Sequence, residues 1–201
     1  MNAAIGRFDP LLDGDSIEIE ILRDGKPMTL SIQPISGREA VIQNRPNGNY
    51  PYIVVGPLVF GPMHYELVGA HLRDRWGNYV YYYGGGPFLD YYGNVTPADG
   101  KEIVTLLSTP LSHPTARGYD AYPGQTIKSV NGETFHNFTE FVTFIADLED
   151  DWLIIEFNEN EASRLVFDRK ELYGATSDIM ESNGIRRAAS KEFRGVWSVD
   201  D

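Results

Sequence analysis

Residues 124–157 read GQTIKSVNGETFHNFTEFVTFIADLEDDWLIIEF and combine two short apolar runs with an amphipathic stretch between them. The runs cover residues 127–130 and 152–157 and have the length of β-strands. Asn131 and Gly132 follow the first run, and both residues tolerate the positive φ angles of a tight reversal. This segment therefore predicts a strand, a turn, a helix and a second strand around one small core. The residues expected to be buried together there are Ile127, Val130, Phe141, Ile145 and Ile154, with Val104 from an earlier strand.

The amphipathic stretch carries the signals of one principal helix. Asn137 followed by Glu140 resembles a capping box, which marks a helix start. An acidic run between residues 147 and 151 marks the solvated end of the helix. Apolar residues recur at spacings of three and four, which places them on one helical face: Phe138, Phe141, Ile145 and Leu148.

Several phrases of the sequence resemble a known family. GQTIKSVNG, with ARGYDAYPG before it, resembles the PDZ-domain segment in which an apolar strand and a VNG turn lead to the groove-forming helix. YIVVGPLVF at 52–60 and ATSDIMESNGI at 175–185 resemble the second PDZ domain of the Deg/HtrA serine proteases, particularly the plant-type members. The resemblance covers roughly residues 50–185.

The predicted fold class is α+β, mainly β. Alternating strand patterns around one helix, together with the resemblance, indicate a PDZ-like, partly open β-sandwich or barrel with one principal helix. A long aromatic insertion and a C-terminal helix are expected in addition. The expected parts are an N-terminal hairpin at 1–35, a linker at 36–50, a PDZ-like domain at 51–170 with its insertion at 61–100, and a C-terminal helix and tail at 171–201.

Residues 16–34 predict a β-hairpin. Isoleucines alternate with glutamates in the phrase IEIEI, which is the period-two pattern of a half-buried strand, and Asp24-Gly25 is a hairpin turn signal. This hairpin resembles the last two strands of a first Deg/HtrA PDZ domain. Two interpretations stay open: the chain is part of a longer parent, or the hairpin docks on the residues that follow it.

Composition excludes several classes of function. The 201 residues carry 29 acidic and 17 basic side chains, a formal net charge of −12, so nucleic acid and anionic membranes are not expected partners. Because the chain has no cysteine, disulfides, thiolate catalysis and cysteine-based zinc sites are excluded. The apolar runs are shorter than the roughly 20 residues of a membrane helix.

The compartment is not predicted by the sequence. Residues 1–10, MNAAIGRFDP, do not have the pattern of a signal peptide, so we expect a soluble chain. The resembled bacterial family suggests the periplasm or cell envelope if a longer parent is exported.

The sequence indicates no catalytic centre. It contains no GxSxG, GNSGG or HExxH phrase, and its four histidines are scattered. His64 and His71 are two helical turns apart, which is too wide for a zinc site without another donor. We therefore expect neither metal nor cofactor and no peptidase activity, because the catalytic triad of the resembled proteases belongs to a different domain.

The resemblance implies a peptide-binding site. Residues 56–60 correspond to the loop in which backbone amides of PDZ domains point at a peptide carboxylate. Pro57 has no N–H and so removes one donor. The alternative, a buried strand with a bend, stays open. The expected peptide-binding residues are Gly56, Pro57, Leu58, Val59, Phe60, Phe141 and Phe144.

Two further segments affect access to this site. Residues 63–76 have helical spacing, and the aromatic phrase YVYYYGGGPFLDYY at 79–92 is expected to fold over the domain as a lid rather than to grip a partner. Residues 172–182 predict one helix. The remaining tail, 186–201, is polar apart from Phe193, Val196 and Trp197, so we expect it to fray.

Two functions compete. The first is a non-catalytic PDZ module of a Deg/HtrA-like protease that binds peptide or protein segments, possibly through their C-termini, or mediates homo-oligomer assembly through a parent protein. The second is a structural oligomerisation element whose groove is filled by its own insertion. A stand-alone hydrolase is disfavoured because no activated nucleophile is evident.

Overall fold

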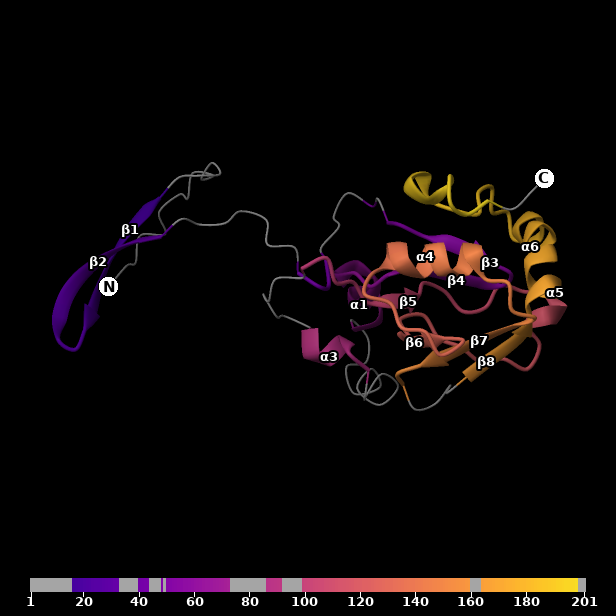
Figure 1. Cartoon of the computed structure of the whole chain (residues 1–201), viewed down its shortest axis with the longest axis horizontal. Coiled ribbons are helices and arrows are strands. Elements are labelled where there is room, and N and C mark those ends of the chain that lie inside the picture. The colour runs from indigo at the N-terminus through magenta and orange to yellow at the C-terminus, as the bar shows by residue number, and fades with distance from the viewer. Residues whose placement is uncertain are drawn as a thin grey trace. The chain divides into compact units, whose positions relative to one another are not determined.

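The computed structural model in Figure 1 divides the chain into two compact units, Met1–Arg38 and Glu39–Asp201. Each unit is described by itself. The structure describes residues 16–32, 40–43, 48, 50–72, 86–91, 99–159 and 164–198.

The first unit contains the predicted hairpin. Strands β1 (Ile17–Arg23) and β2 (Lys26–Ile32) pair antiparallel. Asp24 and Gly25 join them with φ angles of 53° and 75°, as a turn with two left-handed residues requires. Apolar residues of the two strands face each other across the ladder, as in the pair Ile19↔Leu30.

The second unit contains two antiparallel sheets of three described strands each. The first has the order β3 (Ile53–Val55), β4 (Leu58–Pro62), β5 (Val104–Leu106). The second has the order β6 (Ile127–Val130), β7 (Trp152–Phe157), β8 (Arg164–Asp168). An antiparallel bridge between Thr105 and Thr126 connects them. The α+β prediction is confirmed, and the described strands do not close into a barrel.

The described helices lie between and after these strands in the sequence. They are α1 (Tyr65–Leu72), α3 (Phe88–Tyr91), α4 (Phe138–Asp147), α5 (Arg169–Gly174) and α6 (Thr176–Ser182), with short 3-10 turns η1 (Pro114–Ala116) and η2 (Lys191–Phe193). None of the helices in the described ranges is long and apolar enough to cross a membrane.

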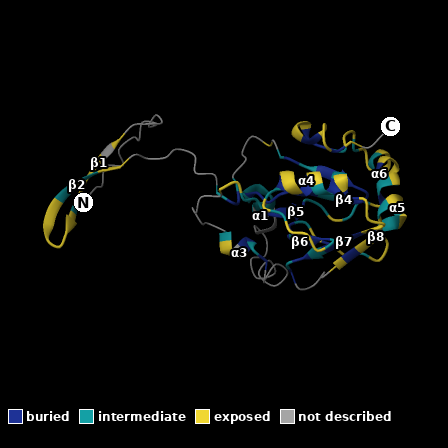
Figure 2. Cartoon of the chain, in the orientation of Figure 1, coloured by how far each residue is buried: buried dark blue, intermediate teal, exposed yellow. Residues whose placement is uncertain are grey.

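Helix α4 begins where the capping signals predicted. The Asn137 side chain accepts a hydrogen bond of 2.9 Å from the Glu140 N–H. The Glu140 carboxylate reaches back to the His136 N–H, also at 2.9 Å, so the box closes one residue before its usual position. In Figure 2 the buried residues lie between α4 and the strands, while the outer face of α4 is exposed.

The predicted core residues are buried, with two exceptions. Phe141, Ile145, Val130 and Val104 are at most 4% exposed. Ile154 was assigned to the wrong face, since Leu153, Ile155 and Phe157 are the inward residues of β7, and Ile127 is also only half-buried. An unbroken apolar run such as WLIIEF has no alternation to indicate which face is inward.

The single helix predicted at 172–182 is instead two helices. Asp168 caps α5 earlier, by accepting from the Glu171 N–H, and the helices are divided at Ala175. Thr176, the first residue of α6, is fully buried. Its hydroxyl donates to the Leu172 carbonyl and accepts from the Gly56 N–H, a tertiary contact that local sequence patterns do not report.

A second apolar cluster lies beside the main core. It joins residues 40–43, which the sequence analysis assigned to a linker, to the start of α1 and to α3 of the aromatic insertion; its buried members are Val41, Ile42, Met63, Phe88 and Ile103. A parallel bridge joins Gln43 to His64. Phe88 therefore packs inward, whereas the rest of the lid predicted at 79–92 lies largely outside the described residues.

Replacing Ile145 by Ala tests the core. Because Ile145 is fully buried on α4, the substitution is expected to lower the free energy of unfolding by about 2–5 kcal/mol. Urea denaturation measures the change. Thr143→Ala, on the exposed face of the same helix, is the matched control and should change stability by less than about 0.5 kcal/mol. An Ile145→Ala effect as small as the control would contradict the assignment of this face to the core.

Candidate functional site

Gly56 and Pro57 form a two-residue turn between β3 and β4, with Val55 paired to Leu58. Gly56 has φ of +55°, and a Cβ here would lie 2.4 Å from a methyl carbon of Leu172, so only glycine fits. Its N–H donates to the Thr176 hydroxyl at 2.8 Å. The Gly56 amide is thus already bonded and Pro57 has none, so two positions of the expected carboxylate loop offer no donor to a ligand.

The other expected peptide-binding residues belong to the core and its rim. Leu58 and Phe60 are buried, and Val59 is half-buried. The Phe60 and Phe141 rings pack with centroids 5.0 Å apart, so these two side chains join the first sheet to α4. Phe144 is half-buried and packs against the edge of the same core. The structure thus brings Leu58, Phe60, Phe141 and Phe144 together as packing elements of one core.

Strand β4 has a neighbour on each edge. Strand β3 pairs along one edge, as in Val54↔Val59, and β5 pairs along the other, as in Phe60↔Leu106. The resemblance implies that a partner strand adds beside residues 58–60. In the described structure both edges of β4 hold strands of the chain itself.

The outer edge of β3 is also paired. The Val54 N–H donates to the Ala188 carbonyl at 2.7 Å, and the Ser190 N–H donates to the Tyr52 carbonyl at 3.0 Å. The Tyr52 N–H donates to the Ser190 hydroxyl at 3.1 Å. Ile53 forms an antiparallel bridge with Ala189. Residues 188–190 therefore occupy the outer edge of this three-stranded sheet.

The segment that follows turns back along the domain, and we name residues 188–197 the C-terminal strap. Phe193 is 8% exposed, and its ring packs edge-on against Phe138, at the start of α4, with centroids 5.1 Å apart. Trp197 is 6% exposed and packs edge-on against Tyr173 of α5. Its indole N–H donates to the Val54 carbonyl at 2.9 Å. The strap therefore contacts both β3 and the helices.

The expectation that residues 186–201 fray was wrong for residues 188–197, which are docked on the domain, and residues 199–201 lie outside the described part of the chain. The polar composition of this tail suggested exposure, but Phe193 and Trp197 find partners far away in the sequence, Val54 being 143 residues from Trp197. No local periodicity reports such a contact. The spacing of two aromatic residues after a helix end was the one available signal, and it was weak.

A family model described as PDZ domain matches residues 41–192, which is most of the chain. The chain belongs to the PDZ domain family. It is also 27% identical over 193 residues to Protease Do-like 2, chloroplastic, of Arabidopsis thaliana, a match that includes 94% of this chain and 30% of that relative. The chain thus spans under a third of the length of a plant Deg-type protease. The resemblance to PDZ domains and the resemblance to plant Deg/HtrA proteases are both confirmed.

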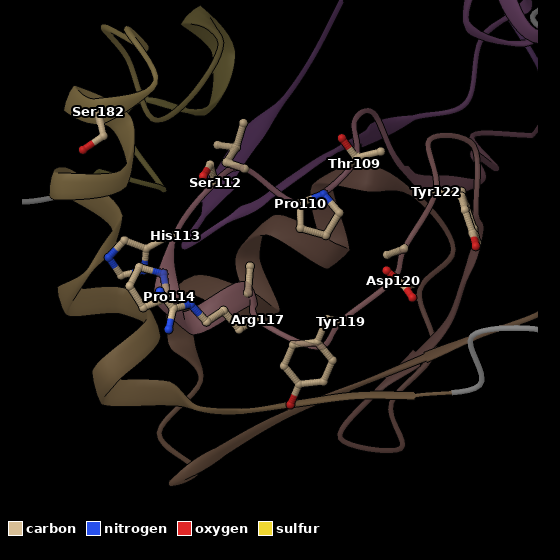
Figure 3. Close-up of a pocket in the computed structure, with 13 residues that line it drawn as sticks. Thr109, Pro110, Ser112, His113, Pro114, Arg117, Tyr119, Asp120, Tyr122 and Ser182 are labelled. Atoms are coloured by element: carbon tan, nitrogen blue, oxygen red, sulfur yellow. The ribbon is translucent and has the colours of Figure 1, made fainter.

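A cavity lies in the loop between β5 and β6. Residues 109–122 of this loop and Ser182 of α6 line a cavity of about 710 Å³, drawn in Figure 3. In the sequence this stretch has only the pattern of a loop, with Pro110, Pro114 and Gly118. Nothing in its residue types marked it as concave, because the concavity depends on α6 packing nearby.

The described residues contain no group of three histidine or acidic side chains that could hold a metal ion. His64 is buried and stacks on Tyr50, with ring centroids 4.1 Å apart. Its Nδ1 accepts from the Leu67 N–H at 3.1 Å, so the ring caps the start of α1. The structure does not describe the side chain of His71. The spacing of His64 and His71 considered from the sequence is therefore not tested.

Glu159, after β7, carries a buried carboxylate. It is 2% exposed and accepts from the Thr126 N–H at 2.9 Å and the Thr126 hydroxyl at 2.7 Å. Burial raises the pKa of Glu159, and the two hydrogen bonds from Thr126 only partly offset that rise. Gly86 lies against this carboxylate, where a Cβ would be 2.2 Å from an oxygen. The arrangement ties strand ends to the insertion and indicates a structural role.

The raised pKa of Glu159 gives stability a definite pH dependence. The folded chain retains this proton to higher pH than the unfolded chain, so the contribution is complete below the unfolded pKa and is lost as the pH rises through the folded pKa. Glu159→Gln keeps an acceptor for the Thr126 N–H and cannot ionise. Its stability relative to the parent should therefore rise as the pH is raised from the ordinary Glu pKa of about 4.3 toward neutrality.

Urea unfolding midpoints across this pH range measure the difference. Glu133→Gln, at an exposed turn, is the matched control and should follow the parent curve. Parallel curves for the parent and Glu159→Gln would show that Glu159 does not contribute to the pH dependence.

Proposed function

We propose that this chain is a non-catalytic PDZ module of a Deg/HtrA-like serine endopeptidase, with an interaction or regulatory role. The PDZ match over residues 41–192 and the 27% identity to part of a plant Deg-type protease support this proposal. Catalysis is assigned to other parts of such a parent, since the described residues offer no metal cluster and the sequence offers no nucleophile phrase.

The proposal about binding rests on the pairing of the outer edge of β3. Both edges of β4 already hold strands of the chain, so the outer edge of β3 is where we propose that an extended partner adds. PDZ domains take extended partners by strand addition, in which main-chain hydrogen bonds give affinity and pockets give selectivity. Here residues 188–190 supply those main-chain bonds to Tyr52 and Val54. An incoming strand must displace the strap, so the module favours protein assembly over capture of free peptides.

The free energy of binding also favours the attached strap over a free peptide. The strap is covalently attached, so it competes with any free peptide at an effective concentration on the order of millimolar. The apparent affinity of a peptide falls by the fraction of molecules whose edge is open. The buried Phe193 and Trp197 rings add apolar contact to the hydrogen bonds and keep that fraction small. A partner held close by the parent assembly also acts at a high effective concentration, so it competes with the strap better than a dilute peptide does.

The alternative is a structural oligomerisation element in which the strap stays permanently bound to the outer edge of β3. The two functions share one resting state and differ in whether the edge can open. The sequence-based form of this alternative assigned occlusion to the aromatic insertion, whereas the described contacts on the β3 edge come from the C-terminal strap.

A substitution at Ser190 separates the two functions. Ser190 has φ of −62°, which proline accepts, so Ser190→Pro removes the N–H bonded to Tyr52 and the hydroxyl that accepts from the Tyr52 N–H. Losing these bonds is expected to tighten binding of an extended peptide about tenfold. Isothermal calorimetry with a hexapeptide that ends in an apolar residue and a free carboxylate, and with its amidated form, measures the change.

The intact chain should show no binding of this peptide below about 1 mM, because its edge is filled. Ser198→Ala, at an exposed position beyond the strap, is the control for the substitution itself. Micromolar binding to the intact chain that depends on the free carboxylate would overturn occlusion. Silence of a folded Ser190→Pro variant would favour the purely structural element.

A further inference from the structure

The cavity in the β5–β6 loop is distinct from the β3 edge and combines charged and apolar lining. Its volume of about 710 Å³ falls in the range of ligand sites in proteins. Figure 3 shows Ser182, His113 and Arg117 on one side of the cavity, with Asp120 and Tyr122 on the other. Leu111 and Ala121 add apolar surface to the lining.

The loop around the cavity is held in one shape by its own hydrogen bonds. The Leu111 N–H donates to the Pro57 carbonyl at 2.7 Å, which attaches one end to the β3–β4 turn. The Tyr122 N–H donates to the Gln125 side chain at 2.7 Å, which fixes the other end. The Tyr119 hydroxyl donates to the Val166 carbonyl of β8. Such preorganisation lowers the entropy lost when a ligand binds.

His113 presents a defined donor. Its Nδ1 accepts from the Thr115 N–H and lies 2.8 Å from the Thr115 hydroxyl, as the cap of η1. A neutral imidazole that accepts at Nδ1 carries its proton on Nε2. The Nε2–H forms no hydrogen bond with the described residues, so it is available to an acceptor at the cavity.

Arg117 supplies a positive charge to the same cavity. It follows η1 directly and is exposed, and its guanidinium makes no hydrogen bond or ion pair within the described ranges. A guanidinium binds a carboxylate through two parallel, charge-assisted hydrogen bonds. Asp120 disfavours an anion at its own side, so the charges of the lining orient a ligand with its negative group toward His113 and Arg117.

We propose that this cavity binds a carboxylate group carried on a peptide, with Arg117 as the charge partner and the His113 Nε2–H as a second donor. Two sources share this chemistry: the C-terminal carboxylate of a chain and the side chain of an internal aspartate or glutamate. The site is independent of the C-terminal strap, so it goes beyond the function proposed for the β3 edge and does not require that edge to open.

Three N-acetylated tripeptides distinguish the sources. The first is Ala-Ala-Leu with a free carboxylate, the second is its C-terminal amide, and the third is Ala-Glu-Leu amide, whose only carboxylate is internal. Each is titrated into the isotopically labelled full chain, and amide resonances are followed by NMR. We expect one or both carboxylate peptides to shift residues 109–122 with a dissociation constant of about 1 mM, and the neutral amide to bind at least about tenfold more weakly.

Arg117→Gln tests the assignment directly. Because the side chain is exposed, the substitution leaves the fold intact, and the affinity for the carboxylate peptides should fall about tenfold. Lys128→Gln removes one charge at an exposed position of β6 outside the cavity and should leave binding unchanged. Equal binding of acid and neutral amide, shifts confined to β3 and the strap, an unchanged affinity in Arg117→Gln, or no shift at about 20 mM peptide would each overturn the proposal.

Discussion

Val54 gives both of its outward backbone groups to the C-terminal strap. Its N–H donates to the Ala188 carbonyl, and its carbonyl accepts from the Trp197 indole. Val54 is 1% exposed, so without the strap these groups would face either water through a newly opened edge or an apolar surface without partners. The same residue pairs with Val59 in β4, so the strap, β3 and β4 form one continuous set of contacts.

This constraint extends into the C-terminal helices. The strap reaches the β3 edge because α5 and α6 turn the chain back across the domain, and buried contacts fix that turn. The Gly56 N–H bonds to Thr176 at the start of α6, and the Tyr173 hydroxyl bonds to the Ile145 carbonyl at the end of α4. The tight Gly56-Pro57 turn, the helix break at Ala175 and the docking of Trp197 therefore depend on one another.

Local signals in the sequence predicted the frame of the PDZ unit. The Asn131-Gly132 turn, the capped helix α4 and the β7–β8 pair each depend on residues that are close in the sequence, and all are present in the structure. Contacts between distant segments were not predicted. The burial of Trp197 and the break between α5 and α6 require partners in β3 and in the Gly56 turn, which no periodicity connects to the tail.

The residues of the candidate site were predicted from the sequence, but the strand pairing around them was not. Residues 56–60 were selected through a family resemblance, and the missing donor of Pro57 was read directly from its chemistry. That β3 and residues 188–190 occupy the neighbouring edges depends on strand pairing, which a sequence without alternation in IVV does not specify. The cavity lined by Arg117 and Ser182 is a product of the packed loop and α6, so composition gave no sign of it.

Native-state hydrogen exchange of the Val54 amide tests the central claim most directly, because this N–H bonds to the strap and not to β4. If the strap occupies the edge, Val54 should be protected at least about a hundredfold and should exchange together with Ser190, through an opening that requires less free energy than the global unfolding reported by core amides such as Ile155. Exchange of Val54 at the rate of an unprotected amide, while Ile155 remains protected, would show that the edge of β3 is free and would contradict the account.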